Sequence, residues 1–250
     1  MSLRAIAGLA VALAAVTGTA FAVQEHDRRE ARVADASLTR QRYVAARILP
    51  EAPVSRADDR GAAGATQVDP AWLATTAGAT GIPAPALRAY ARAQLADAGG
   101  CGVGWTTLAG VGWVESYHGT IGGRTLGRDG RSSSPILGPA LDGHGRFAAI
   151  RSTATSRAWH GDPVWEHAVG PMQFLPGTWA TWATDGDGDG RRSPLDLDDA
   201  AAAAARYLCA GGHDLSSGSG WADAILTYNR ARSYVDEVYA AAVGYADAAG

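Results

Sequence analysis

The 250-residue sequence contains no lysine, so arginine supplies every basic side chain. Only two cysteines are present, and two cysteines alone do not make a zinc site. The formal net charge of −3 gives no sign of a partner nucleic acid. The missing lysine accompanies abundant alanine and glycine, which indicates a compositional bias rather than a phosphate-binding surface. Hydrophobic residues make up 47% of the chain, enough for one sizeable core.

Residues 1–23 have the pattern of an export segment. Arg4 supplies a positive charge, residues 5–16 are apolar, and residues 20–22 (Ala-Phe-Ala) are typical of a signal-peptide cleavage site. The alternative is an uncleaved membrane anchor through residues 5–23, since apolar or small residues nearly reach the length of a bilayer span. No cysteine lies near residue 22, so a lipoprotein is not indicated. Either reading predicts a secreted or cell-envelope protein, outside the cytoplasm.

The rest of the chain divides into a linker and one globular domain. Residues 24–69 carry charged patches and too little apolar surface for a core, so we predict a flexible linker there. Residues 70–250 carry helical periodicity without strand-like alternation, which predicts a mainly α domain. Residues 119–167 form a long segment without periodicity, and such segments are usually functional or mobile. The clearest predicted helices begin at Pro85 or cover 198–208, 221–228 and 234–246.

Glu115 is a lone carboxylate on an apolar helical stripe. Leu108, Val111 and Glu115 are spaced to share one helical face. Gly119 is a natural residue for the turn after the helix, which places Glu115 in the last turn. Burial and the helix dipole then both disfavour the charged form and raise the pKa. A carboxyl group still protonated near neutral pH is what a general acid requires. The ordinary alternative is a solvent-exposed glutamate near a helix end.

Three short motifs follow one another along the chain: Glu115-Ser116, Gly170-Pro171-Met172-Gln173-Phe174 and Tyr228-Asn229-Arg230. In this order, over roughly residues 70–246, the sequence resembles the lytic transglycosylases of the lysozyme-like superfamily. Within that family it is most similar to the membrane-bound type B enzymes of actinobacteria. The resemblance implies an α+β lysozyme-like fold that is mainly α, and a monomer that acts on the glycan strands of peptidoglycan.

The resemblance also implies a role for each matching residue. Glu115 corresponds to the single catalytic acid and base of the family. The residues expected to bind or position the substrate are Ser116, Met172, Gln173, Phe174, Tyr228 and Asn229. Within this set, Tyr228 and Asn229 match the pair that orients the acid and contacts the sugar.

A single carboxylate has a chemical consequence, because a glycosidase normally uses two. In the family, the N-acetyl group of the substrate assists departure of the leaving sugar, and the C6 hydroxyl of N-acetylmuramic acid attacks C1. The expected product is a 1,6-anhydro ring, formed by a lyase without water and without a cofactor. A second carboxylate from Asp129, Asp142, Asp162 or Glu166 would instead make the protein a hydrolytic muramidase. The third reading is a non-catalytic wall-binding protein on the same fold.

The run Asp185-Gly-Asp-Gly-Asp-Gly190 has the spacing of a calcium-binding loop. The predicted ligands of a structural Ca²⁺ are the side chains of Asp185, Asp187, Asp189 and Asp196 and the carbonyl of Arg191. The alternative is an acidic glycine-rich turn that binds nothing.

The two cysteines are Cys101, just before the Glu115 helix, and Cys209, at the end of the alanine-rich helix. An exported protein permits a disulfide between them. The alternative is a pair of buried free thiols.

Overall fold

The structure is a computed structural model that describes residues 42–48, 66–96, 100–145 and 148–250. The predicted signal or anchor segment and most of the predicted linker lie outside the described residues. The chain divides into two units, Met1–Arg42 and Tyr43–Gly250, and the structure below is that of the second unit. None of the helices in the described ranges is both long and apolar enough to cross a membrane.

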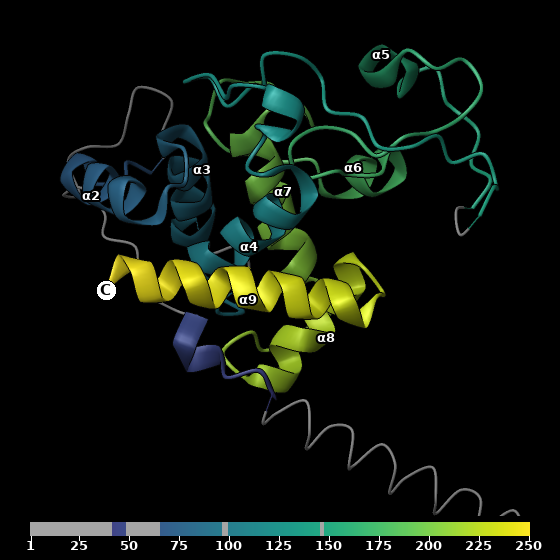
Figure 1. Ribbon diagram of the computed structural model, residues 1–250. Coiled ribbons are helices and arrows are strands. Elements are labelled where there is room, and N and C mark those ends of the chain that lie inside the picture. Colours follow the sequence, from purple (N-terminus) through teal and green to yellow (C-terminus); the bar gives the residue numbers. More distant parts are fainter. Residues whose placement is uncertain (1–41, 49–65, 97–99, 146–147) are drawn as a thin grey trace, which may run out of the picture. The chain divides into compact units, whose positions relative to one another are not determined.

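The described part of the chain is built from eight α-helices and two short 3₁₀ helices (Figure 1). The α-helices are α2 (Pro70–Thr80), α3 (Ala84–Leu95), α4 (Trp105–Ser116), α5 (Arg157–His160), α6 (Pro176–Trp182), α7 (Leu197–Cys209), α8 (Gly218–Tyr228) and α9 (Arg232–Ala249). The 3₁₀ helices are η1 (Ala45–Ile48) and η2 (Ile121–Gly123). Within the same ranges, β-structure is limited to isolated bridges. The predicted mainly α class is therefore confirmed.

Local signals at the helix starts explain several of these elements. Asp69 accepts a hydrogen bond from the Trp72 amide at 2.7 Å, and Pro70 occupies the first turn of α2. Pro85 lies in the first turn of α3, as the sequence predicts. Asp196 caps α7 by accepting a hydrogen bond from the Asp198 amide.

Helix α4 lies at the centre of the domain, with α9 crossing it in Figure 1. Its residues Trp105, Leu108 and Val111 are fully buried. Gly110 allows the close crossing, because a Cβ atom there would lie only 2.6 Å from the carbonyl oxygen of Val238 on α9. The helix that carries Glu115 is therefore held in a fixed position by packing.

A disulfide joins Cys101 to Cys209, as predicted, across a sequence separation of 108 residues. It connects the segment just before α4 to the last residue of α7. Both Glu115 and the Gly170–Phe174 motif lie within the closed loop.

Part of the predicted linker belongs to the hydrophobic core. Tyr43 and Ile48 are buried, and the Tyr43 hydroxyl donates to Asp236 Oδ1 on α9 at 2.5 Å. The Thr106 hydroxyl on α4 donates to the carbonyl of Ile48. Sequence reasoning assigned too little apolar surface to this stretch, because the apolar residues that matter here are few and widely spaced.

Candidate active site

Glu115 lies in the last turn of α4, as predicted, and its side chain is mostly buried. The helix ends through Tyr117 and His118, which both have left-handed backbone conformations, rather than at Gly119 as expected. The amides of Tyr117 and His118 donate to the carbonyls of Trp113 and Gly112, each at 2.9 Å. These two bonds satisfy the last carbonyls of α4 and fix the orientation of the turn that carries Glu115.

Burial raises the pKa of Glu115 to about 7, against an ordinary value of 4.5. The hydroxyl of Tyr234, near the start of α9, donates to Glu115 Oε1 at 2.6 Å and acts in the opposite direction, lowering that pKa. Near neutral pH the carboxyl group therefore exchanges between its acid and base forms. This arrangement gives Glu115 the properties of a general acid that can later act as a base.

Sequence reasoning missed Tyr234. It lies six residues after Tyr228 and outside the Tyr-Asn-Arg motif. Its only sequence signal is a position next to the turn between two helices, which does not reveal what the hydroxyl contacts.

The Gly170–Phe174 motif forms a tight turn. Val169 and Phe174 exchange two backbone hydrogen bonds of 2.9 and 3.0 Å, and Gln173 has a left-handed backbone conformation. Gly170 also has a positive φ, and a Cβ atom there would lie 1.8 Å from the carbonyl oxygen of Pro194. Only glycine fits this position.

Three of the predicted substrate-binding side chains are buried: Ser116, Met172 and Phe174 are 1%, 0% and 2% exposed. The Ser116 hydroxyl donates to the carbonyl of Pro171 at 2.5 Å and accepts from the Gly119 amide at 2.8 Å. The side chain of Ser116 thus joins the end of α4 to the motif turn. In the structure the side chains of these three residues are packed beneath the site and are not accessible to a substrate.

Gln173 is only partly buried, and its side-chain amide donates to the carbonyl of Gly170 at 2.8 Å. The Tyr228 hydroxyl donates to the carbonyl of Met172 at 2.8 Å, so it holds the same turn. The Tyr228 ring lies nearly parallel to that of Tyr234, with centroids 6.5 Å apart. Asn229 follows at the end of α8 and is exposed. The substrate contacts of Gln173, Tyr228 and Asn229 stay a prediction.

The four alternative carboxylates have partners of their own. Asp129 accepts from the Arg131 amide, Asp142 pairs with His144, and Asp162 pairs with His167. Glu166 is buried and accepts hydrogen bonds from Ser156 and His160 at 2.6 and 3.1 Å. Among the described residues, no second carboxylate contributes to the shifted pKa of Glu115.

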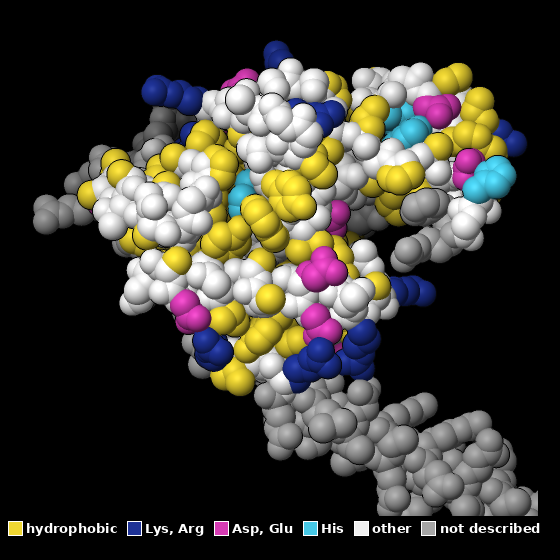
Figure 2. Space-filling view, viewed as in Figure 1, with side chains coloured by type: hydrophobic (Ala, Val, Ile, Leu, Met, Phe, Trp, Pro, Cys, Tyr) yellow, Lys and Arg dark blue, Asp and Glu magenta, His cyan; other side chains and the backbone are white. Residues whose placement is uncertain are grey.

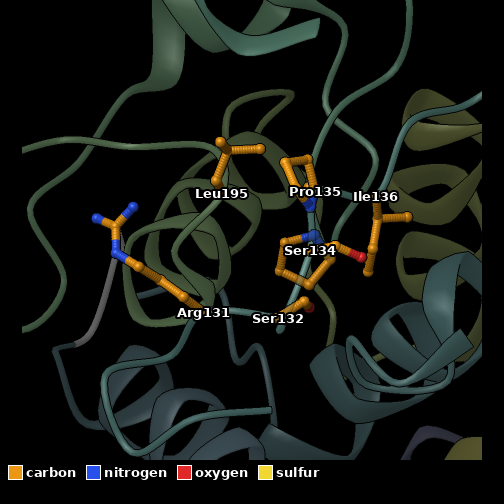
Figure 3. A pocket seen from close by; sticks show the side chains of 8 residues that line it. Arg131, Ser132, Ser134, Pro135, Ile136 and Leu195 are labelled. Atoms are coloured by element: carbon orange, nitrogen blue, oxygen red, sulfur yellow. The ribbon is translucent and has the colours of Figure 1, made fainter. Parts of the chain in front are cut away.

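A hollow of about 190 Å³ borders the motif turn (Figure 3). Its lining residues are Arg131, Ser132, Ser134, Pro135, Ile136, Gly170, Pro171 and Leu195. In Figure 3 the Arg131 side chain extends away from the segment of Ser134 to Ile136. The Arg131 guanidinium lies 3.5 Å from Asp196, which partly neutralises its charge.

The acidic loop brings together the carboxylates of Asp185, Asp187 and Asp199, with one oxygen from each lying within 4.8 Å of the others. Asp199 completes this group in place of Asp196, which caps α7 and pairs with Arg131. The reason is the helical start of α7, which turns Asp199 toward the loop so that it accepts from the amides of Gly186 and Ser193, each at 2.8 Å. Carboxylate oxygens are the ligand type that calcium prefers, but calcium takes six to eight oxygen ligands, so these three carboxylates would supply only part of its coordination.

Another predicted calcium ligand, Asp189, lies beside this group, where its amide donates to Asp187 Oδ1 at 3.0 Å. Asp189 is exposed and accepts from the amide of Arg191 at 2.7 Å. Burial, with repulsion from the neighbouring carboxylates, raises the pKa of Asp199 to about 6. The loop therefore concentrates negative charge that a cation would neutralise.

Residues 151–223 match the family model for the Transglycosylase SLT domain. No curated protein and no solved structure matches the chain. The matched region contains the motif turn, the acidic loop and α7, whereas Glu115, Tyr228 and Tyr234 lie outside it. The chain is thus similar over this region to a transglycosylase domain, and the assignment of Glu115 depends on the geometry above.

Proposed function

We propose that the protein is a peptidoglycan lytic transglycosylase that cleaves the β-1,4 bond between N-acetylmuramic acid and N-acetylglucosamine. The observation that carries the proposal is Glu115, a buried carboxyl with a pKa of about 7 that accepts a hydrogen bond from Tyr234. The similarity of residues 151–223 to the Transglycosylase SLT domain supports the same reaction class. Within that class, the motif turn favours the membrane-bound type B enzymes.

Glu115 acts first as an acid and then as a base. Its protonated carboxyl gives a proton to the glycosidic oxygen, so that the bond from C1 to the leaving sugar breaks. The N-acetyl carbonyl oxygen of the substrate stabilises C1. The Glu115 carboxylate then removes the proton from the C6 hydroxyl, and O6 bonds to C1. The carboxyl is protonated again at the end, and no water is consumed.

The test is mass spectrometry of the fragments that the full chain releases from purified peptidoglycan, beside Glu115→Gln and the exposed control Asp223→Asn. We expect 1,6-anhydro ends from the unsubstituted protein and from the control, and no fragments from Glu115→Gln. Ends heavier by one water would identify a muramidase. Binding to peptidoglycan without release by any of the proteins would make this a wall-binding protein and overturn the proposal.

We place the enzyme outside the cytoplasm, secreted if residues 1–23 are a cleaved signal peptide and held in the cell envelope if they are an anchor, and we expect a monomer. The disulfide between Cys101 and Cys209 supports this location, because disulfides persist in oxidising compartments. Intact-mass measurement of the protein recovered from the envelope and from the medium would show whether the chain has been cleaved after residue 22.

We further propose that the acidic loop holds one structural Ca²⁺ through Asp185, Asp187 and Asp199. A bound ion would neutralise these carboxylates and fix the start of α7. Calcium at about 100 times its dissociation constant should stabilise the fold by about 2.7 kcal/mol, or roughly 5–10 °C in melting temperature.

Thermal melts with calcium and with a chelator measure this effect. Asp199→Asn should abolish the calcium-dependent increase, whereas the exposed control Asp223→Asn should keep it. Equal melting temperatures with calcium and with the chelator would show that the loop binds no calcium.

A further inference from the structure

Two large aromatic side chains at the end of α4 are exposed: Trp113 in the helix and Tyr117 just after it, on either side of Glu115 in the sequence. Trp113 is 43% exposed and Tyr117 is 48% exposed, whereas residues 105–112 of α4 are all buried. Their rings lie in contact, with centroids 4.5 Å apart. Figure 2 shows that hydrophobic side chains gather on the face where α9 crosses α4 in Figure 1. Contiguous exposed apolar side chains, unlike single ones, are a feature of binding surfaces.

These rings form one wall of a groove between α4 and α9 with a volume of about 300 Å³. The groove is lined by Trp113, Val114, Tyr117, Glu237, Ala240 and Ala241. Val114 is the sequence neighbour of Glu115, and Glu237 lies three residues, or about one helical turn, after Tyr234. The groove therefore includes the residue next to Glu115 on α4 and a residue about one helical turn from Tyr234 on α9.

The chemistry of the groove fits a neutral sugar. The aromatic rings offer flat apolar faces, and Ala240 and Ala241 add small apolar surface beside them. The carboxylate of Glu237 accepts hydrogen bonds from hydroxyl or amide groups. The lining contains this carboxylate and no basic side chain, which disfavours acidic ligands such as peptide carboxylates or phosphate polymers.

We propose that Trp113, Tyr117 and Glu237 form a distal subsite that holds one sugar of the glycan strand as the strand extends away from Glu115. This proposal rests on the proposed function, since the occupant is the continuation of the same substrate. The aromatic pair stacks on the apolar face of the sugar ring, and Glu237 accepts a hydrogen bond from its hydroxyl or N-acetyl amide group. The enzyme then binds long strands more tightly than short ones, whereas the rate of the chemical step is the same for both.

The test uses the full chain with Glu115→Gln, which cannot cleave, and calorimetric titration with β-1,4-linked N-acetylglucosamine oligomers. We expect affinity to rise from a disaccharide to an octasaccharide. Trp113→Ala in this background should lose about fivefold of the affinity for the octasaccharide and leave the disaccharide unchanged. Trp113→Tyr should retain most of the gain, and the exposed control Val44→Ala should retain all of it.

A second pair of variants keeps the test decisive if Trp113→Ala fails to fold, because Trp113 also contacts His118. Tyr117→Gly suits the left-handed backbone at this position, and Glu237→Ala removes an exposed side chain. Each variant should reduce the increase in affinity from the disaccharide to the octasaccharide. An unchanged gain in these folded variants would overturn the subsite, even if the unsubstituted enzyme releases 1,6-anhydro fragments. A gain that depends on Trp113 without any such fragments would instead overturn the proposed function alone.

Discussion

At the scale of single residues, the central feature is a carboxyl group under two opposing influences. Burial raises the pKa of Glu115, and the hydrogen bond from Tyr234 lowers it. The result, about 7, lies where one group can both give and accept a proton. One substitution, Glu115→Gln, removes the titrating group, and another, Tyr234→Phe, removes the hydrogen bond.

Glu115→Gln should stabilise the protein at high pH. Because the folded pKa of about 7 exceeds the ordinary value of 4.5, the folded state binds more protons between these values, and stability falls as pH rises through this window. The glutamine variant lacks this loss, so near pH 8 it should be more stable by up to roughly 3 kcal/mol. Urea denaturation near pH 8 and near pH 4 measures the effect. A stability difference that is the same at both pH values would contradict it.

Tyr234→Phe removes the hydrogen bond that lowers the pKa of Glu115. The alkaline limb of the pH profile of kcat/KM should therefore move to higher pH. Tyr239→Phe, on the same helix but with its hydroxyl bonded to Val44, should leave the profile unchanged. Coincident profiles for Tyr234→Phe and the unsubstituted enzyme would show that this hydrogen bond does not set the pKa.

At the scale of elements, α4 is linked to other parts of the fold near both of its ends. Before its start, the disulfide joins Cys101 to the end of α7. At its end, the Ser116 hydroxyl joins the helix to the motif turn at Pro171. The reacting carboxyl is thereby positioned by two elements that are distant in the sequence.

Loss of the disulfide should lower stability by about 4 kcal/mol, because the bond closes a loop of about a hundred residues. This corresponds to a melting temperature lower by roughly 10 °C in a reducing agent. The double variant Cys101→Ser/Cys209→Ser should melt at that lower temperature with or without the reductant. A melting temperature that reductant leaves unchanged would contradict the expected stabilisation.

At the scale of the whole molecule, the sequence predicts where the motifs lie. It does not predict which residues of a motif are buried supports and which can contact the substrate. The helical class and the last-turn position of Glu115 follow from local patterns, the disulfide follows from a pair of cysteines in a chain predicted to be exported, and all three are confirmed. Met172 and Phe174 appeared in a motif that the resemblance assigns to the cleft, yet both are buried. A sequence motif shows which residues occur together, but it does not show which of their side chains are buried and which are accessible to a substrate.

Contacts between distant elements could not be predicted for a related reason. Tyr234 reaches Glu115 across 119 residues of sequence, and Asp199 joins the acidic loop because α7 begins just before it. Both contacts depend on the direction in which a helix starts after the preceding turn, relative to the rest of the fold. Residue spacing along the sequence does not determine that direction.

The packing of Tyr43 and Ile48 affects how the protein can be divided. A fragment starting at Pro70 keeps every residue of the proposed active site, but it loses two buried side chains worth about 1.5–3 kcal/mol each. That is a large share of the net stability of a typical domain. It also uncovers apolar surface on α9 and near Trp221, where Tyr43 packs in the full chain. Such a fragment would tend to aggregate, or to recruit the missing segment from an intact chain added to it.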